Sequence, residues 1–232
     1  INTVMSYASY VVGGVEADLR EDGRRRLDLS TLYLETGLIP HAAHSARLAL
    51  GHTDVLAAVL PELIDAPNGA IVVNVSLAAD ITHVPPYTSL DAAVAQLEAA
   101  LNALYAPSCI ADALAPLTIA SSAQCWQLRV HAQLLRCGGC PLDAISLAVR
   151  AALHGALVPK IVAAPPPQEG VAAASQLDLD IEESMDESTP FDASSAPIFV
   201  TLATIGAHFV AERTATDGAA VGSAPPVAVN AR

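Results

Sequence analysis

The sequence has few basic residues and no long uninterrupted apolar run. Its 232 residues include 11 Lys and Arg against 24 Asp and Glu, a net charge of −13. Because neutralised phosphates dominate the affinity of proteins for nucleic acids, this deficit argues against autonomous binding of RNA or DNA. No run reaches the roughly 18 consecutive apolar residues that a membrane helix needs. We therefore expect a soluble protein that makes no membrane contact.

Cysteine is also scarce, and nothing in Ile1–Tyr10 has the charged start and apolar stretch of a secretory signal. An intracellular, reduced protein with free thiols is therefore expected. Cys137 and Cys140 form a lone Cys-x-x-Cys pair, which could be a redox pair or half of a zinc site. A zinc site needs two more ligands, and no second pair exists. A turn with two small half-buried residues is favoured, with no metal or cofactor.

The first half of the chain, residues 1–115, is predicted to be rich in strands. A leading helix is expected over Tyr7–Glu16. Short strands separated by polar or glycine breaks are expected over Leu32–Gly37, Ser45–Gly51, Thr53–Leu60 and Ile71–Val75. Leucine and valine then recur every three or four residues over Leu90–Tyr105, which predicts an amphipathic helix packed on the sheet. Thr88 with Asp91 resembles a capping box ahead of that helix.

The second half, residues 116–232, begins with a strand. Apolar and polar residues alternate from Trp126 to Leu134, so one face is expected to be buried. Pro141 suits the first position of a following helix, which Gly155 ends. An acidic solvated loop over residues 165–192, a closing hairpin over Pro197–Val210 and a tail without a clear element complete this half.

Three stretches together resemble the RNase PH-like subunits of RNA exosome rings. They are Tyr10–Arg24 with its Arg-x-Asp-Gly-Arg signature, Glu35–Gly37 with Ser45–Leu56, and Cys125–Trp126 with Cys137–Ala148. Each is weak alone, but together they span most of residues 7–210. Within the family, the similarity is closest to the type that alternates with the catalytic subunit in archaeal rings. That type has a non-catalytic eukaryotic descendant.

The resemblance implies an α+β, RNase PH-like two-layer sheet and helix fold, similar to domain 2 of ribosomal protein S5. It implies side-by-side packing into a hexameric ring with other RNase PH-like subunits, and contact with S1/KH cap subunits. RNA would be reached through the complex during RNA processing and degradation, including rRNA processing. The implied location is the nucleus and nucleolus, and also the cytoplasm.

The resemblance also identifies a degenerate phosphate loop. Catalytic relatives bind inorganic phosphate where Gly-Gly precedes Ser or Thr and then Arg at a helix N-terminus. Here Gly138 and Gly139 are followed by Cys140 and Pro141, so one N–H donor and the arginine are missing. We expect no catalytic residues. Nearby Asp143 is expected to stabilise the helix dipole.

Two further features bear on RNA. Archaeal relatives carry arginines on the helix corresponding to Leu90–Tyr105, whereas Leu101–Tyr105 has none, and Tyr105 could offer only stacking. Four arginines are candidates for RNA contact or a subunit interface, with pairing to acids of a neighbour or of this domain favoured: Arg20, Arg24, Arg25 and Arg26.

The favoured function is a structural, non-catalytic subunit of the exosome core ring. The alternative is an active phosphorolytic 3′-to-5′ exoribonuclease subunit, against which Cys140 and Pro141 argue. A small-molecule enzyme on a similar scaffold is a third class. No nucleophile–base pair, glycine-rich phosphate motif or metal motif supports it.

Overall fold

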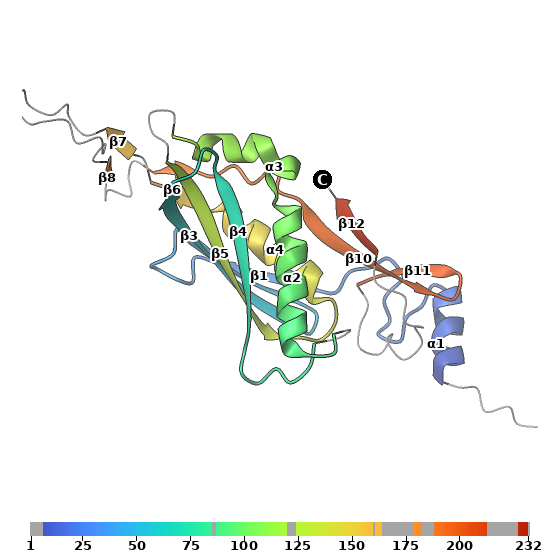
Figure 1. Cartoon of the computed structure of the whole chain (residues 1–232). Coiled ribbons are helices and arrows are strands. Elements are labelled where there is room, and N and C mark those ends of the chain that lie inside the picture. Colours follow the sequence, from blue (N-terminus) through green and yellow to red (C-terminus); the bar gives the residue numbers. More distant parts are fainter. Residues whose placement is uncertain are drawn as a thin grey trace, which may run out of the picture.

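Figure 1 shows the computed structural model of the chain. The structure describes residues 7–84, 87–119, 124–159, 161–163, 179–181, 188–212 and 227–231. The helices are α1 (Tyr7–Glu16), α2 (Leu90–Leu104), α3 (Pro107–Leu114), the 3-10 turn η1 (Ala115–Leu117) and α4 (Pro141–His154). The longer strands are β1 (Leu32–Thr36), β2 (His44–Leu50), β3 (Thr53–Ile64), β4 (Ala70–Leu77), β5 (Cys125–Arg136), β10 (Ile198–Ile205), β11 (His208–Ala211) and β12 (Val227–Ala231). Two short pairs complete the set, β6 (Leu157–Val158) with β9 (Thr189–Pro190) and β7 (Ile161–Ala163) with β8 (Leu179–Ile181).

The main sheet has five strands in the order β1-β2-β3-β5-β4. Strand β5 comes from the second half of the sequence, yet it lies between β3 and β4 of the first. It pairs antiparallel with β3 and parallel with β4. One sheet therefore unites both halves of the chain.

Helices α2 and α4 cover this sheet, α2 over β4 and α4 over β2 and β3 (Figure 1). Helix α4 also contacts β10 of a second sheet, whose order is β11-β10-β12. It is thus enclosed on two sides, which explains why nine of its fourteen residues are buried. None of the helices in the described segments is both long and apolar enough to cross a membrane.

The edge of the main sheet at β4 is closed by side chains of α2. The amide oxygen of Asn102 accepts a hydrogen bond from Val73 N at 2.9 Å, and its amide nitrogen donates to Val73 O at 2.9 Å. Glu98 Oε1 accepts from Val75 N at 2.8 Å. Because unpaired backbone groups at a sheet edge invite pairing with another strand, these contacts keep β4 from extending the sheet.

Most predicted elements are confirmed, including the leading helix, the amphipathic helix, and Gly155 at the end of α4. The cap of α2 differs, since Ser89 Oγ and not Thr88 accepts the hydrogen bond from Ala92 N, at 3.2 Å. The prediction of a tail without an element was wrong, because β12 lies within it. Helix α3 was not predicted. Most of the acidic loop over 165–192 lies outside the described residues, but Phe191 within it is buried.

The alternation along β5 places its apolar side chains inward, as expected. Trp126 is 6% exposed and Leu128, Val130 and Leu134 are fully buried against the helices. The intervening polar residues lie on the opposite face of the sheet.

Replacing Trp126 with alanine should therefore lower the free energy of unfolding by about 3–5 kcal/mol, because a large buried ring leaves a cavity. Urea unfolding of the purified chain measures this. The neighbouring Gln127→Ala change, on the other face of β5, serves as the control and should cost at most about 0.5 kcal/mol. Equal stability of the two variants would show that the face assignment is inverted.

Candidate functional site

The glycine loop between β5 and α4 rests on the turn between β2 and β3. Gly138 N donates to Thr53 Oγ1 at 3.2 Å. A Cβ atom on Gly138 would lie 2.3 Å from the Cβ of His52, which is far below a van der Waals contact. Glycine is thus required at this position because of the close approach of the two turns.

The N-terminus of α4 offers no N–H at its first helical position. Its N-cap residue Cys140 makes no side-chain capping bond, and Pro141 occupies the first helical position, as predicted. Proline has no N–H to offer an anion. Burial raises the pKa of the Cys137 thiol, although a hydrogen bond from the Gly139 backbone opposes the shift. A raised pKa disfavours the thiolate, so Cys137 is not an activated nucleophile.

Asp143 in the first turn of α4 is buried, with 4% of its surface exposed. Its Oδ2 accepts a hydrogen bond from Thr201 N at 2.8 Å and its Oδ1 accepts one from Thr201 Oγ1 at 2.6 Å. Burial raises the pKa of Asp143 to about 6, opposed by the Thr201 hydrogen bonds and assisted by the charge of Glu212. Asp143 lies in the first turn of α4, where a role at the helix dipole was expected, and its hydrogen bonds also tether α4 to β10. The carboxylate also opposes the approach of an anion to this helix end.

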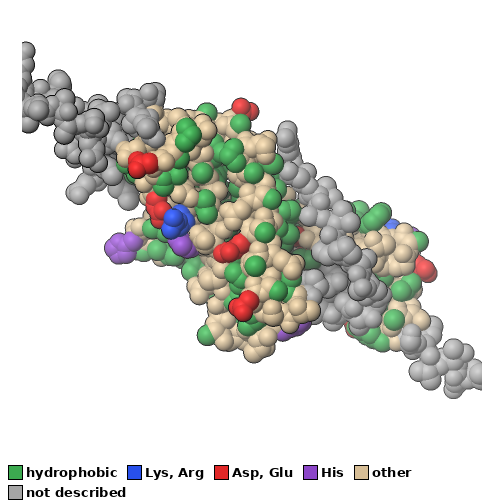
Figure 2. All heavy atoms as spheres, viewed as in Figure 1, with side chains coloured by type: hydrophobic (Ala, Val, Ile, Leu, Met, Phe, Trp, Pro, Cys, Tyr) green, Lys and Arg blue, Asp and Glu red, His purple; other side chains and the backbone are tan. Residues whose placement is uncertain are grey.

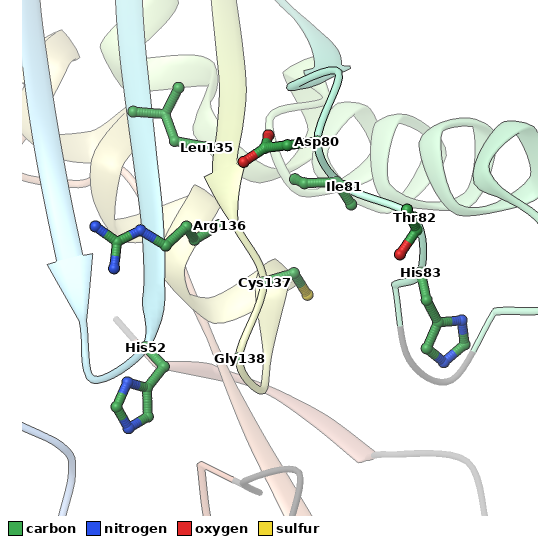
Figure 3. A pocket seen from close by; sticks show the side chains of 9 residues that line it. All are labelled: His52, Asp80, Ile81, Thr82, His83, Leu135, Arg136, Cys137 and Gly138. Carbon is green, nitrogen blue, oxygen red and sulfur yellow. The ribbon is translucent and has the colours of Figure 1, made fainter.

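A pocket of roughly 290 Å³ opens beside the glycine loop (Figure 3). In the view shown, Arg136 and His52 lie on one side of the Cys137–Gly138 backbone and His83 lies on the other. Among the residues that the structure describes, no three His, Cys, Asp or Glu side chains are placed to hold a metal ion. The pocket is lined by His52, Asp80, Ile81, Thr82, His83, Leu135, Arg136, Cys137 and Gly138.

Of the four candidate arginines, Arg20 and Arg24 bind the end of β11. Arg20 is 3% exposed, and its guanidinium donates to the carbonyl oxygens of Ala211 and Glu212, both at 3.0 Å. Arg24 Nη1 donates to Glu212 Oε2 at 3.0 Å, and its Nη2 donates to Asp22 Oδ2 at 2.7 Å. Although partial burial opposes the shift, the Arg24 hydrogen bonds lower the pKa of Asp22.

The other two arginines differ from each other. Arg26 Nε donates to Asp18 Oδ1 at 2.9 Å, and this hydrogen bond lowers the pKa of Asp18. Its Nη1 lies 2.6 Å from Nδ1 of His208. Arg25 has an exposed side chain. Pairing within the domain, one of the two favoured interpretations, therefore accounts for Arg20, Arg24 and Arg26, and Arg25 projects into solvent.

Sequence reasoning missed Glu212, which joins these features. It is buried, and its Oε2 also accepts a hydrogen bond from Ser30 N. A Cβ atom on Gly51 would lie 3.6 Å from Glu212 Oε1, so Glu212 borders the turn that carries His52. Glu212 follows the apolar stretch Phe209-Val210-Ala211 and precedes Arg213 without forming a motif, so no local signal marks it.

The face of the molecule shown in Figure 2 presents few Lys and Arg side chains. On the face shown in Figure 2, acidic side chains are scattered and basic ones gather in one small area. Tyr105 is buried, its hydroxyl donates to Pro197 O at 3.4 Å, and burial raises its pKa. The expectation that Tyr105 could stack on a base was therefore wrong.

Comparison with known proteins gives a family match. The sequence model of RNase PH, described as "3′ exoribonuclease family, domain 1", matches residues 28–159. The "Putative exosome complex exonuclease RRP42" of Dictyostelium discoideum is 23% identical over 278 residues, covering 97% of this chain and 83% of that protein.

Solved structures share the fold. An archaeal exosome core gives a TM-score of 0.66 at 22% identity, over 94% of this chain and 76% of that one. The Archaeoglobus fulgidus exosome with RNA bound to the active site gives a TM-score of 0.66 at 23% sequence identity. The match covers 94% of this chain and 79% of that one. Rice (Oryza sativa) Rrp46 gives a TM-score of 0.53 at 14% sequence identity. The match covers 87% of this chain and 77% of that one. The predicted RNase PH-like fold is confirmed.

The buried Asp143 carboxyl predicts a pH-dependent stability. Because its pKa rises from 3.8 to about 6 on folding, its contribution favours the folded state below pH 3.8 and is lost as the pH rises through 6. An Asp143→Asn variant keeps both partners on Thr201 but has no charge. Between pH 4 and 7 it should gain about 2–3 kcal/mol of unfolding free energy relative to the unmodified chain.

Urea unfolding at a series of pH values measures the difference. The exposed Asp192→Asn variant is the control and should not reproduce this gain. If the difference in unfolding free energy between Asp143→Asn and the unmodified chain stays constant over this pH range, the raised pKa of Asp143 is contradicted.

Proposed function

This chain belongs to the RNase PH family, the 3′ exoribonuclease family, whose domain 1 matches residues 28–159. We propose that it is a structural, non-catalytic subunit of an RNA exosome core ring. In this role it supports 3′-to-5′ RNA processing and degradation, including that of rRNA. Its neighbours are other RNase PH-like subunits and S1/KH cap subunits, and RNA meets it through the complex. It acts in the nucleus and nucleolus and also in the cytoplasm.

The observation that carries the proposal is the chemistry at the start of α4. Pro141 removes an N–H, no arginine follows the glycines, and the buried Asp143 carboxyl lies in the first turn. Phosphorolysis requires a bound and oriented phosphate, and a helix N-terminus binds an anion through free N–H groups and the helix dipole. The loop therefore lacks two of the groups that would hold phosphate and adds a charge of the wrong sign.

The alternative is an active phosphorolytic 3′-to-5′ exoribonuclease subunit. The name of the Dictyostelium relative, an exonuclease, favours it. Against it, His52 and Arg136 lie on the other side of the glycine-loop backbone from His83 in the view shown (Figure 3). Arg20 is engaged with backbone carbonyl oxygens of the chain and Arg24 with its acids, which also leaves both poorly placed to clamp RNA.

Assembly is tested by purifying native complexes from cells through an affinity tag on this chain. Native mass spectrometry should show a hexameric ring that contains several different RNase PH-like chains, with cap subunits released at higher collision energy. The same chain purified alone should give no such ring. A complex without a second RNase PH-like chain would overturn the ring proposal.

Activity is tested by incubating RNA with the purified chain, or with a ring that lacks other nucleases, in the presence of inorganic phosphate. No nucleoside diphosphates should be released, because losing one preorganised donor alone typically costs about 100- to 1000-fold in rate. The double variant Cys140→Ser, Pro141→Arg should remain inactive, since Leu101–Tyr105 also lacks the arginines that archaeal relatives carry on the corresponding helix. Phosphate-dependent trimming by the unmodified chain that Gly139→Asp abolishes would establish the alternative.

A further inference from the structure

Helix side chains accept hydrogen bonds from two strands of this fold, at the β4 edge of the main sheet and along the part of β10 that β11 does not pair. At β4 the closing groups are Asn102 and Glu98 of α2. At β10, Ser146 Oγ of α4 accepts from Phe199 N at 3.0 Å, and Asp143 accepts from Thr201 N at 2.8 Å. In both places, a side chain takes the hydrogen bond that a neighbouring strand would otherwise make.

The opposite edge of the main sheet, at β1, has no such closure among the described residues. Among the strands that the structure describes, β1 pairs with β2 alone. Gly37 N donates to Ser45 O at 2.8 Å and Gly51 N donates to Thr31 O at 3.2 Å. Since antiparallel strands alternate between paired and outward backbone groups, the outward N–H and C=O groups belong to Leu32, Leu34 and Thr36.

This open edge is also apolar. Tyr33 is 59% exposed and Leu34 is 44% exposed. Natural proteins blunt free edges with charges, proline or bulges, whereas β1 carries one acid and no proline or basic residue. Six of the ten exposed large apolar side chains in the described residues fall between positions 27 and 38: Leu27, Leu29, Leu32, Tyr33, Leu34 and Leu38.

We propose that β1 is a docking edge on which an extended strand of a different ring subunit adds to the main sheet. Backbone hydrogen bonds to Leu32, Leu34 and Thr36 set the register, and the leucines and Tyr33 supply the apolar contact. A second copy of this chain is disfavoured because each copy carries a net charge of −13, and like charges repel. The partner strand is thus apolar and comes from a less acidic or basic chain. The inference rests on the proposed ring function and names the surface that ring formation uses.

Hydrogen exchange at single-residue resolution tests the edge. The isolated chain and the native complex purified through it are compared by mass spectrometry with electron-transfer fragmentation. The amides of Leu32, Leu34 and Thr36 should exchange at least about tenfold more slowly in the complex. The amides of Tyr33 and Glu35 point toward β2 and serve as the internal control, since they should already be protected in the isolated chain.

A matched pair of variants separates the backbone from the side chain. Leu34→Pro removes the outward N–H, and proline is tolerated at such an edge position because no bond to β2 is lost. Leu34→Ala keeps that N–H and shortens the side chain. Leu34→Pro should weaken incorporation into the complex by about ten- to a hundred-fold, because the partner's acceptor is left unpaired, and should do so more than Leu34→Ala. Thermal unfolding of each isolated variant reports on its fold.

The outcomes are distinct. A mixed ring is one that contains this chain together with other RNase PH-like chains. Slower hydrogen exchange of the outward amides in a mixed ring, and not in the isolated chain, supports the inference even if Leu34→Pro does not fold. A mixed ring in which these amides exchange as fast as in the isolated chain overturns the docking edge and leaves the ring function standing. A dimer of the isolated chain with the same amides protected shows that the occupant is a second copy. Absence of any mixed ring overturns both proposals.

Discussion

The enclosure of α4 between two sheets is the constraint on which the rest of the structure depends. A helix in that position must present apolar side chains to β2, β3 and β5 and still satisfy the backbone of β10. It does so with two buried polar residues, since Ser146 and Asp143 accept hydrogen bonds from alternate β10 amides. Burial of a carboxyl is costly unless it is hydrogen-bonded, which explains both the tight contacts of Asp143 with Thr201 and its raised pKa.

The same constraint shapes the glycine loop. The helix begins directly at the loop, so whatever ties its first turn to β10 also fixes the groups near Gly138 and Gly139. A carboxylate committed to the β10 backbone is compatible with a structural element and unfavourable for holding phosphate. Structural support and anion binding make different demands on one helix end, and in this chain Pro141 occupies its first position while Asp143 bonds to β10.

Much of this fold was predictable because it depends on local periodicity. The alternation along β5 and the three- and four-residue spacing in α2 and α4 each follow from burial of one face. The order of the strands did not follow, because the position of β5 between β3 and β4 depends on contacts distant in sequence. Proline and glycine marked the loop and the start of α4 correctly. Glu212 could not have been found, since its role comes from Arg24 and Ser30, which lie far away in the sequence.

The contact between Arg20 and the end of β11 has a consequence for synthesis on the ribosome. Arg20 and Ala211 are separated by 191 residues. At translation rates of about 5–20 residues per second, roughly 10 to 40 seconds pass between the synthesis of the two partners. During that interval the guanidinium that ends up almost fully buried remains in water, and the segment around it has no folded partner. Strands β1 to β3 can pair in that time, but the N-terminal segment can dock only after β11 has emerged.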